Sequence, residues 1–247
     1  MILALDIGNT KIKWGLREQG LWQSQGSVAT AEPDQLVSLI THHQPRALYV
    51  ANVSHANLNQ LINHTVSTSK TPTYFLSGES PLPPLVNLYH EPQALGVDRW
   101  LSLFAARRFQ EGPLLVVNSG TATTIDSLSD DHQFLGGIII PGLDMMTNAL
   151  HLGTANLPPV HSERGEEWPR NTANALSRGA IEATVGAIVQ RYTLLNEISE
   201  NPITVILSGG SHPIVSQHLF ISHQCIDNLP LEGLGFYIDM NEPNSDN

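Results

Sequence analysis

Two short polar stretches in this sequence combine residue types that could bind the phosphates of a nucleotide. The first reads Asp6-Ile7-Gly8-Asn9-Thr10 and follows the apolar run Ile2–Leu5. A buried strand of this kind delivers a carboxylate to a tight turn, where it can hold a metal ion or its waters. Small turn residues also aim backbone N–H groups at one point, which suits an anion. We therefore predict a phosphate site formed by Asp6, Gly8, Asn9, Thr10 and Lys11.

The conformation expected for this first stretch is a β-hairpin. Gly8 and Asn9 both tolerate positive φ, so a two-residue connection at these positions predicts a second strand over about Thr10–Leu16. An ordinary hairpin in which Asp6 only caps the turn would explain the same residues. The stretch alone does not decide between these two interpretations.

A related pattern occurs again further along the chain. The apolar run Leu114–Val117 leads into Asn118-Ser119-Gly120-Thr121, and a second β-rich segment follows. Two similar strand-turn-strand units indicate a duplicated domain with one phosphate turn in each half. The second phosphate turn is then expected at Gly120 and Thr121.

A third glycine-containing turn follows another apolar strand. Ser208-Gly209-Gly210 comes directly after the run Ile203–Leu207. In a duplicated α/β fold, turns at strand ends are expected to converge on the cleft between the lobes. We therefore predict that Gly209 and Gly210 lie near the nucleoside.

A possible second anion site lies at the start of a predicted helix. The apolar period that begins near Asp98 and Arg99 places both residues in the first helical turn, where backbone N–H groups and the helix dipole favour an anion. A capping carboxylate at Asp98 and a surface charge at Arg99 would explain the same pattern. In isolation, that simpler interpretation is the better one.

The order of predicted elements indicates how these turns are positioned. Three β segments end near Val28, and helices and strands then alternate as far as Leu76. This order is typical of an RNase H-like α/β lobe. A break at Gln110–Pro113 separates it from a second lobe of similar order. We predict two duplicated RNase H-like, actin-like ATPase lobes with an interlobe cleft, over residues 1–111 and 112–241, followed by a disordered tail over 242–247.

Composition restricts the classes of function. The 247 residues include 41% hydrophobic residues, enough for one or two cores, and the formal net charge is −11 with no basic run. This charge argues against nucleic-acid binding, because phosphate backbones require clustered Lys and Arg. The single cysteine, Cys225, excludes an intrachain disulfide and favours a reducing compartment. Since neither a signal peptide nor a membrane-length apolar run is evident, we expect a cytoplasmic protein that binds no membrane.

Sequence signatures of several other active sites are absent from the chain. None of the lysines, Lys11, Lys13 and Lys70, follows a glycine, so there is no Walker-type loop. The chain also lacks a Gly-x-Ser-x-Gly elbow, a His-Glu-x-x-His helix and a Cys-x-x-Cys pair. The strand-end turns therefore remain the main functional candidates.

Taken together, the motifs closely resemble those of the type III pantothenate kinases, a family of the acetate/sugar kinase–Hsp70–actin superfamily. The resemblance spans nearly the whole chain. It rests on DIGNT at Asp6–Thr10, LGVDR at Leu95–Arg99 with Tyr89 upstream, SGTATTID at Ser119–Asp126, GGIIIPG at Gly136–Gly142, TANLP at Thr154–Pro158, Thr172 with Gly179, and the Ser-Gly-Gly turn. Each motif is weak alone, but the combination is highly specific.

The resemblance implies an enzyme that transfers a phosphoryl group from ATP to pantothenate and forms 4′-phosphopantothenate, the first step of coenzyme A biosynthesis. It implies that Asp6 organises Mg²⁺ and that Asp98 is the general base. It also implies a homodimer with the vitamin pocket at the subunit interface. The implied pantothenate-binding residues are Tyr89, Gly96, Val97, Asp98, Arg99 and Thr172.

One position departs from the family pattern. Asn118 stands where the family usually has an aspartate associated with a monovalent cation, K⁺ or NH₄⁺. Asn118 keeps a carbonyl ligand but loses a formal charge, so we expect weaker cation binding and a doubtful K⁺ requirement. This departure leaves open a nucleotide-binding accessory or regulatory protein without turnover. A kinase for another small hydroxyl compound on the same scaffold is a second alternative. Formation of 4′-phosphopantothenate by the purified protein distinguishes a pantothenate kinase from the regulatory protein, and screening acceptors with ATP and Mg²⁺ distinguishes it from the other kinase.

Overall fold

The computed structural model describes residues 1–162 and 166–242 and contains two compact α/β units. Of the described residues, the first unit comprises 1–105 together with 228–242, and the second comprises those between Ala106 and Asp227. Each unit is built around its own β-sheet. No helix in the described part of the chain has both the length and the apolar character needed to cross a membrane.

The sheet of the first unit has the strand order β3-β2-β1-β4-β5. β1 is antiparallel to β2 and parallel to β4, so the chain makes a three-stranded meander before its first helical crossover. The elements of this unit are β1 (Ile2–Ile7), β2 (Lys11–Glu18), β3 (Leu21–Ala29), α1 (Pro33–His43), β4 (Leu48–Asn52), α2 (Ala56–Val66), β5 (Thr73–Leu76), β6 (Val86–Asn87), the 3₁₀ helix η1 (Pro92–Ala94) and α7 (Leu229–Asn241). Helix α3 (Val97–Phe109) begins in this unit and crosses into the second.

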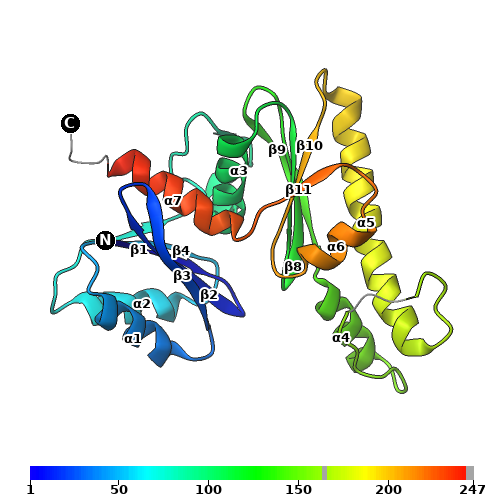
Figure 1. Ribbon diagram of the computed structural model, residues 1–247, viewed down its shortest axis with the longest axis horizontal. Coiled ribbons are helices and arrows are strands. Elements are labelled where there is room, and N and C mark those ends of the chain that lie inside the picture. Colours follow the sequence, from blue (N-terminus) through cyan, green and yellow to red (C-terminus); the bar gives the residue numbers. More distant parts are fainter. Residues whose placement is uncertain (163–165, 243–247) are drawn as a thin grey trace. The chain divides into compact units, whose positions relative to one another are not determined.

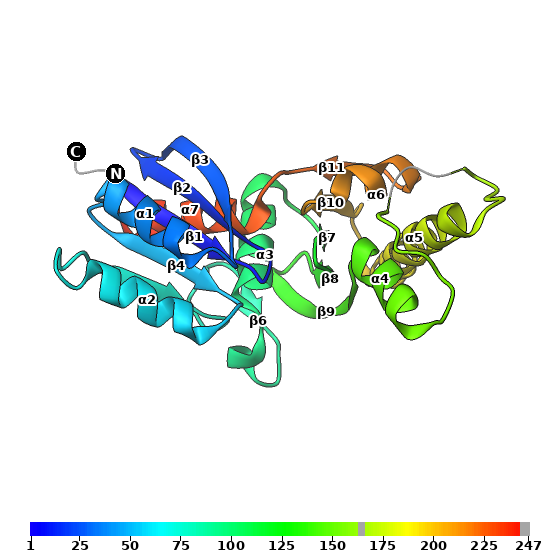
Figure 2. The same cartoon turned by 90° about the horizontal axis from the view of Figure 1, so that it is seen from below.

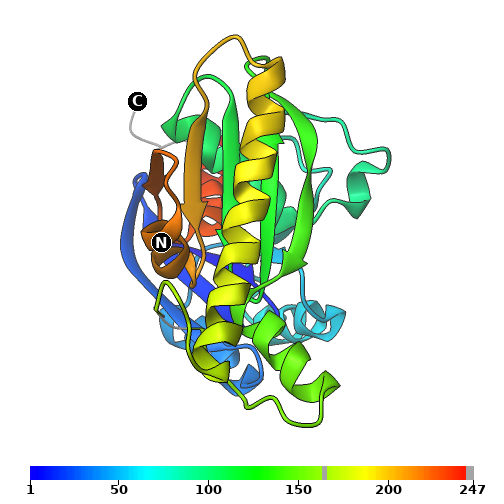
Figure 3. The ribbon, with the colours of Figure 1, turned by 90° about the vertical axis from the view of Figure 1, so that its right-hand side faces the viewer.

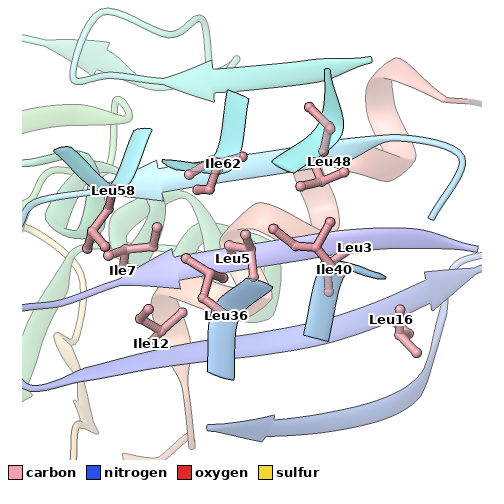
Figure 4. Close-up of a cluster of buried hydrophobic side chains, with 12 residues drawn as sticks. Leu3, Leu5, Ile7, Ile12, Leu16, Leu36, Ile40, Leu48, Leu58 and Ile62 are labelled. Atoms are coloured by element: carbon pink, nitrogen blue, oxygen red, sulfur yellow. The ribbon is translucent and has the colours of Figure 1, made fainter. Parts of the chain in front are cut away.

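Helices cover both faces of this first sheet (Figures 1 and 2). On one face, Leu3, Leu5 and Ile7 of β1 pack with Leu36 of α1 and Ile62 of α2 in a fully buried cluster (Figure 4). Because side chains alternate along a strand, the residues between them point to the other face. That face is covered by α7, which contacts β1, β2 and β4. Asp6 therefore lies on the face that carries α7.

The second unit contains a mixed sheet in which the order β11-β10-β7-β8-β9 is continuous. β7 is antiparallel to β8 and parallel to β10, as β1 is to β2 and β4 in the first unit. Its elements are β7 (Leu114–Ser119), β8 (Ala122–Leu128), β9 (Gln133–Pro141), α4 (Leu143–Gly153), α5 (Thr172–Ile198), β10 (Thr204–Ser208), α6 (His212–His218) and β11 (His223–Cys225). The repeated strand arrangement confirms the predicted duplication of an α/β lobe.

One long helix supplies most of the core of the second unit. Figure 3 shows α5 lying along one face of the sheet. Its buried residues Ile181 and Ile188 pack with Leu115 and Val117 of β7 and Ile125 of β8. The alternate residues Asn118 and Thr124 consequently point to the opposite face of this sheet.

Two local predictions about the first unit are wrong. Neither Gly8 nor Asn9 has positive φ, and the Gly8 N–H donates to the Lys11 carbonyl at 3.0 Å, so Asn9 and Thr10 form the tip of the hairpin. Glycine is favoured at position 8 by space instead, because a Cβ there would lie 3.2 Å from that carbonyl oxygen. The sequence also predicts Ser54 as the N-cap of the helix that carries Leu58, Leu61 and Ile62, but the N-cap residue of α2 is His55.

The final helix differs from its predicted position in the second lobe, residues 112–241. Helix α7 clusters with the first unit, because its apolar residues Leu231, Leu234 and Ile238 are buried there. Glu242, predicted to begin the disordered tail, accepts hydrogen bonds from Arg46 and Tyr49. Residues 243–247 of that predicted tail lie outside the described residues.

Candidate functional site

Asp6 lies at the end of β1 as a buried carboxylate. Its residue is only 7% exposed, and among the described residues no group donates a hydrogen bond to its side chain. Burial raises its pKa to about 7; nearby Lys13 opposes this rise and the Asp98 carboxylate adds to it. An uncompensated buried carboxylate of this kind is stabilised when a cation binds beside it.

Asp98 lies in the first turn of α3, as predicted. Its Oδ1 accepts a hydrogen bond of 2.8 Å from the Arg99 backbone N–H, and this bond orients the carboxylate. Gly96 allows this orientation, because a Cβ at that position would lie 2.6 Å from Asp98 Oδ1. Burial raises the pKa of Asp98, while the hydrogen bond from Arg99 opposes the rise. Asp6 and Asp98 interact electrostatically, so the first unit brings the two predicted carboxylates together.

Arg99 and Tyr89 form a second polar pair in the same unit. The Arg99 Nη1 donates to the Tyr89 hydroxyl at 2.9 Å, and the Arg99 guanidinium lies 5.7 Å from the centroid of the Tyr89 ring. Arg99 is only 5% exposed. Trp100 Nε1 donates to the Ser80 carbonyl at 2.9 Å and attaches the segment before α3 to the helix. Val97, the first residue of α3, is buried and anchors the same turn.

The hairpin tip between β1 and β2 is held from within. Thr30 Oγ1 donates to the Gly8 carbonyl at 2.8 Å, and the Thr30 N–H donates to the Thr10 carbonyl at 3.1 Å. Gly8 therefore shapes the turn with both of its backbone polar groups. Asn9 and Lys11 are exposed, and the described residues offer the Asn9 side chain no hydrogen bond. These two side chains are the groups of the tip that remain available to an anion.

Three strand-end turns meet in the second unit because two glycines permit close backbone approach. A Cβ on Gly209 would lie 2.3 Å from the Ser119 carbonyl oxygen, and Gly209 also has a φ of +90°. A Cβ on Gly142 would lie 2.0 Å from the Gly120 carbonyl oxygen. The Gly142 N–H donates to the Thr121 carbonyl at 3.0 Å. The predicted turns at Gly120–Thr121 and Gly209–Gly210 are thus brought together.

Beside these turns, Asn118 and Thr124 present two buried oxygen atoms. The residues are directly opposite each other on β7 and β8. Neither Asn118 Oδ1 nor Thr124 Oγ1 has a hydrogen-bond partner in the described part of the chain. Unsatisfied buried oxygens are costly, and carbonyl and hydroxyl oxygens are suitable ligands for a hard cation. Their chemistry therefore fits a monovalent cation, although Asn118 carries no charge.

Thr172 is the first residue of α5. The preceding Asn171 caps this helix by accepting a hydrogen bond of 2.8 Å from the Asn174 N–H. Thr172 is exposed. It thus lies at a helix N-terminus, where backbone N–H groups favour negatively charged groups.

Three residues of these sites were not predicted from the sequence. Lys13 lies opposite Asp6 in the β1–β2 register, and Thr124 lies opposite Asn118. Gly142 supports the second phosphate turn. The predicted turn at Gly8–Asn9 would have placed Lys11 opposite Asp6. The observed turn at Asn9–Thr10 shifts this register by two residues and places Lys13 there instead.

The described residues contain no group of three or more His, Cys, Asp or Glu side chains able to hold a metal ion. Mg²⁺ does not require such a cage, because it commonly binds through one or two carboxylates, waters and the phosphates of a substrate. Asp6, buried and without a hydrogen-bond donor, fits this manner of binding.

Sequence comparison identifies the relatives of the chain. A family model described as type III pantothenate kinase matches residues 2–193. The type III pantothenate kinase of Dechloromonas aromatica is 39% identical over 95% of this chain and 97% of its own length. That of Janthinobacterium sp. is 35% identical over 95% of this chain and 96% of its own length.

Solved structures share the fold at low sequence identity. A protein from Sinorhizobium meliloti named as a 2-dehydro-3-deoxygalactonokinase aligns with a TM-score of 0.61 and 12% identity, over 98% of this chain and 100% of its own. A protein from Campylobacter jejuni named as a Baf family transcriptional activator aligns with a TM-score of 0.60 and 23% identity, over 97% of this chain and 98% of its own. These likenesses confirm the actin-like, sugar-kinase type of fold.

Proposed function

The chain belongs to the type III pantothenate kinase family, and we propose that it catalyses the reaction in that name. ATP-dependent phosphorylation of pantothenate gives 4′-phosphopantothenate, the first step of coenzyme A biosynthesis. The observation that carries the proposal is the pair of carboxylates formed by buried Asp6 and half-buried Asp98, which influence each other within one unit of a chain whose relatives are kinases.

Asp98 is proposed as the group that accepts the proton of the reacting hydroxyl. The hydroxyl oxygen forms a bond to the γ-phosphorus of ATP, the bond between this phosphorus and the β,γ-bridging oxygen breaks, and ADP leaves. The hydroxyl proton passes to the Asp98 carboxylate. Burial raises the pKa of Asp98 and makes its carboxylate more basic than an exposed aspartate. A strong base is unnecessary, because phosphoryl transfer depends mainly on positioning and charge neutralisation.

The other proposed roles are those that the family resemblance implies for the matching residues. The hairpin tip, with Asn9, Thr10 and Lys11, and the turn with Gly120 and Thr121 are proposed to bind the ATP phosphates, and Gly209–Gly210 the nucleoside side. Arg99 with Tyr89 is proposed to bind the pantothenate carboxylate, because a guanidinium pairs strongly with this group. Gly96, Val97 and Thr172 complete the proposed pantothenate set.

Two cations are proposed to assist the reaction. Asp6 would hold Mg²⁺, which neutralises phosphate charge when bound to ATP. Asn118 and Thr124 would bind K⁺ or NH₄⁺ weakly, because their oxygens are neutral. We also propose a homodimer, to be tested by light scattering after size exclusion, and the cytoplasm as the compartment, consistent with the free, exposed Cys225 thiol.

The proposal is tested with purified protein, ATP, Mg²⁺ and pantothenate. Formation of equal amounts of ADP and 4′-phosphopantothenate, detected by mass spectrometry, is the expected result. A panel of other small alcohols tests acceptor choice in parallel. Nucleotide binding without turnover on any acceptor would contradict the proposed activity and favour a regulatory protein, whereas turnover confined to another alcohol would contradict pantothenate as the substrate.

A further inference from the structure

We propose that His212 is a positioning residue for ATP: its imidazole fixes the direction of the Gly210 N–H, which donates to the nucleoside. This inference rests on the part of the proposed function that assigns the Gly209–Gly210 turn to the nucleoside side of ATP. Neither the motifs nor the comparisons assign a role to His212, which is the first residue of α6.

The imidazole of His212 holds the carbonyl group of Gly209. Its Nδ1 lies 2.7 Å from the Gly209 carbonyl oxygen, and because this oxygen can only accept a hydrogen bond, Nδ1 is the donor. The backbone N–H of His212 donates to the same oxygen at 3.2 Å. Asp227 borders the other side of the ring, where its Oδ1 lies 3.8 Å from Nε2, and the His212 side chain is only 15% exposed. The ring is therefore confined while it holds the carbonyl.

This contact determines where the next N–H of the chain points. The Gly209 carbonyl and the Gly210 N–H belong to one trans peptide group, so they lie in one plane and point in opposite directions. A peptide group between two glycines rotates easily, because neither residue has a Cβ that restricts φ and ψ. The hydrogen bond from His212 opposes this rotation. It therefore fixes the direction of the Gly210 N–H without any contact to that group.

The Gly210 N–H is a donor that remains available to a ligand. No described residue accepts a hydrogen bond from it. Gly210 is exposed, and a Cβ built on it would meet no atom within 4 Å, whereas Gly209 lies tightly against Ser119 of β7. The turn is thus anchored at its first glycine and open at its second. A donor that is already held in its bound direction loses little conformational entropy on binding, so His212 is expected to increase the affinity for ATP.

The test measures the binding of ATP and of tripolyphosphate, each with Mg²⁺, by calorimetric titration. His212→Leu removes the imidazole donor, so the dissociation constant for ATP should rise about five- to tenfold, which corresponds to the loss of about one hydrogen bond. Tripolyphosphate has no nucleoside, so its dissociation constant should change by less than about twofold. The kcat for pantothenate at saturating ATP should also change by less than about twofold, because a loss of uniform binding raises KM alone.

Two further variants control for the chemistry and the place of this change. In His212→Asn the amide nitrogen takes the position of Nδ1 and can donate to the Gly209 carbonyl, so the affinity for ATP should recover to within about twofold. His218→Leu removes a similar contact from the same helix, because His218 Nδ1 lies 2.9 Å from the Ile214 carbonyl oxygen. This contact holds no part of the turn, so the affinity for ATP should stay within about twofold. His212→Ala replaces the leucine variant if that variant does not fold.

The outcomes separate this inference from the proposed function. An unaltered chain that binds ATP but forms no 4′-phosphopantothenate contradicts the proposed function, and the ATP affinities of the variants still decide the role of His212. Normal ATP affinity of His212→Leu contradicts the inference alone. An equal loss of affinity for ATP and tripolyphosphate also contradicts it, because this result indicates a phosphate contact or a general structural role, and so does a loss that asparagine does not relieve. An unaltered chain that binds no ATP contradicts both proposals.

Discussion

Asp98 is partly buried, and a hydrogen bond orients its carboxylate. Replacing it with asparagine keeps the shape of the side chain but removes its negative charge. Asparagine can still accept the Arg99 N–H bond, but it cannot accept the proton of a hydroxyl. We expect Asp98→Asn to lower kcat about 10²–10⁴-fold and to change ATP affinity by less than about threefold, or about 0.7 kcal/mol. Calorimetric ATP titration and steady-state kinetics measure the two effects.

A matched control for this change is Asp131→Asn, because Asp131 is exposed on the turn between β8 and β9. It should leave both quantities unchanged. Asp98→Asn with normal turnover would remove Asp98 from the role of proton acceptor. Loss of ATP affinity equal to the loss of turnover would instead place Asp98 in the nucleotide site.

Asn118 allows a test of the proposed cation site. Asn118 lies directly opposite Thr124 in the β7–β8 pair, and neither Asn118 Oδ1 nor Thr124 Oγ1, both buried, has a hydrogen-bond partner among the described residues. Asn118→Asp restores the charge that the family usually has here, so half-maximal stimulation should need about tenfold less K⁺, equivalent to about 1.4 kcal/mol. Initial rates in KCl, with tetramethylammonium chloride holding ionic strength constant, provide the measurement.

The second oxygen of this pair supplies the control. In the Asn118→Asp background, Thr124→Val removes the hydroxyl with little change of shape and should abolish the gain in K⁺ response. Equal K⁺ responses of the unaltered chain and Asn118→Asp would show that these oxygens do not form a cation site.

At the scale of elements, the turn between β10 and α6 depends on a residue without a side chain. Gly209 has a φ of +90°, and a Cβ there would lie 2.3 Å from the Ser119 carbonyl oxygen. Gly209→Ala should therefore lower the free energy of unfolding by more than about 2 kcal/mol, because it adds backbone strain to a steric clash. Urea unfolding followed by circular dichroism measures the change.

The same unit provides an internal control for glycine replacement. Gly186 lies within α5, and a Cβ there would meet no atom within 4 Å. Gly186→Ala should therefore stabilise the helix by about 0.5–1 kcal/mol. If both replacements shift unfolding in the same direction and by the same amount, close approach at Gly209 does not determine the stability of this turn.

The sequence predicted the strands of this fold better than its short helices and turns. Apolar runs such as Ile2–Leu5 and Leu114–Val117 require burial on both faces, so they identified β1 and β7 without any knowledge of tertiary contacts. Helix α6 and strand β11 were not predicted, because His212–His218 and His223–Cys225 are too short and too polar to show a hydrophobic period.

The residues of the candidate site were also predicted only in part. Asp6 and Asp98 were identified by their positions at the start of a turn and of a helix. Lys13 and Thr124 could be found only from strand register, which local sequence does not specify. The conformation of Gly8 was predicted wrongly, because a glycine that can adopt a positive φ need not do so. Close approach of the Lys11 carbonyl is what restricts this position.

At the scale of the whole molecule, the last helix, α7, packs against the sheet of the first unit, which the beginning of the chain forms. Arg17 of β2 is 5% exposed, and its Nε donates to Asp239 Oδ1 of α7 at 2.8 Å. The Arg17 guanidinium also lies 4.6 Å from the centroid of the Trp22 ring. The apolar pattern of α7 does not indicate which of the two sheets the helix covers. For this reason its packing against the first unit was not predicted.

This link predicts that two ion pairs of the same helix end differ in strength. Asp239→Ala leaves the buried Arg17 guanidinium without its counter-charge, so the free energy of unfolding should fall by about 2 kcal/mol, less than for a fully buried pair because Asp239 is one-third exposed. Arg46→Gln breaks the pair with Glu242, in which the Arg46 side chain is 61% exposed, and should cost less than about 1 kcal/mol. Thermal unfolding in low and high salt compares the variants. Equal losses would mean that burial of Arg17 does not strengthen the attachment of α7 to the first unit.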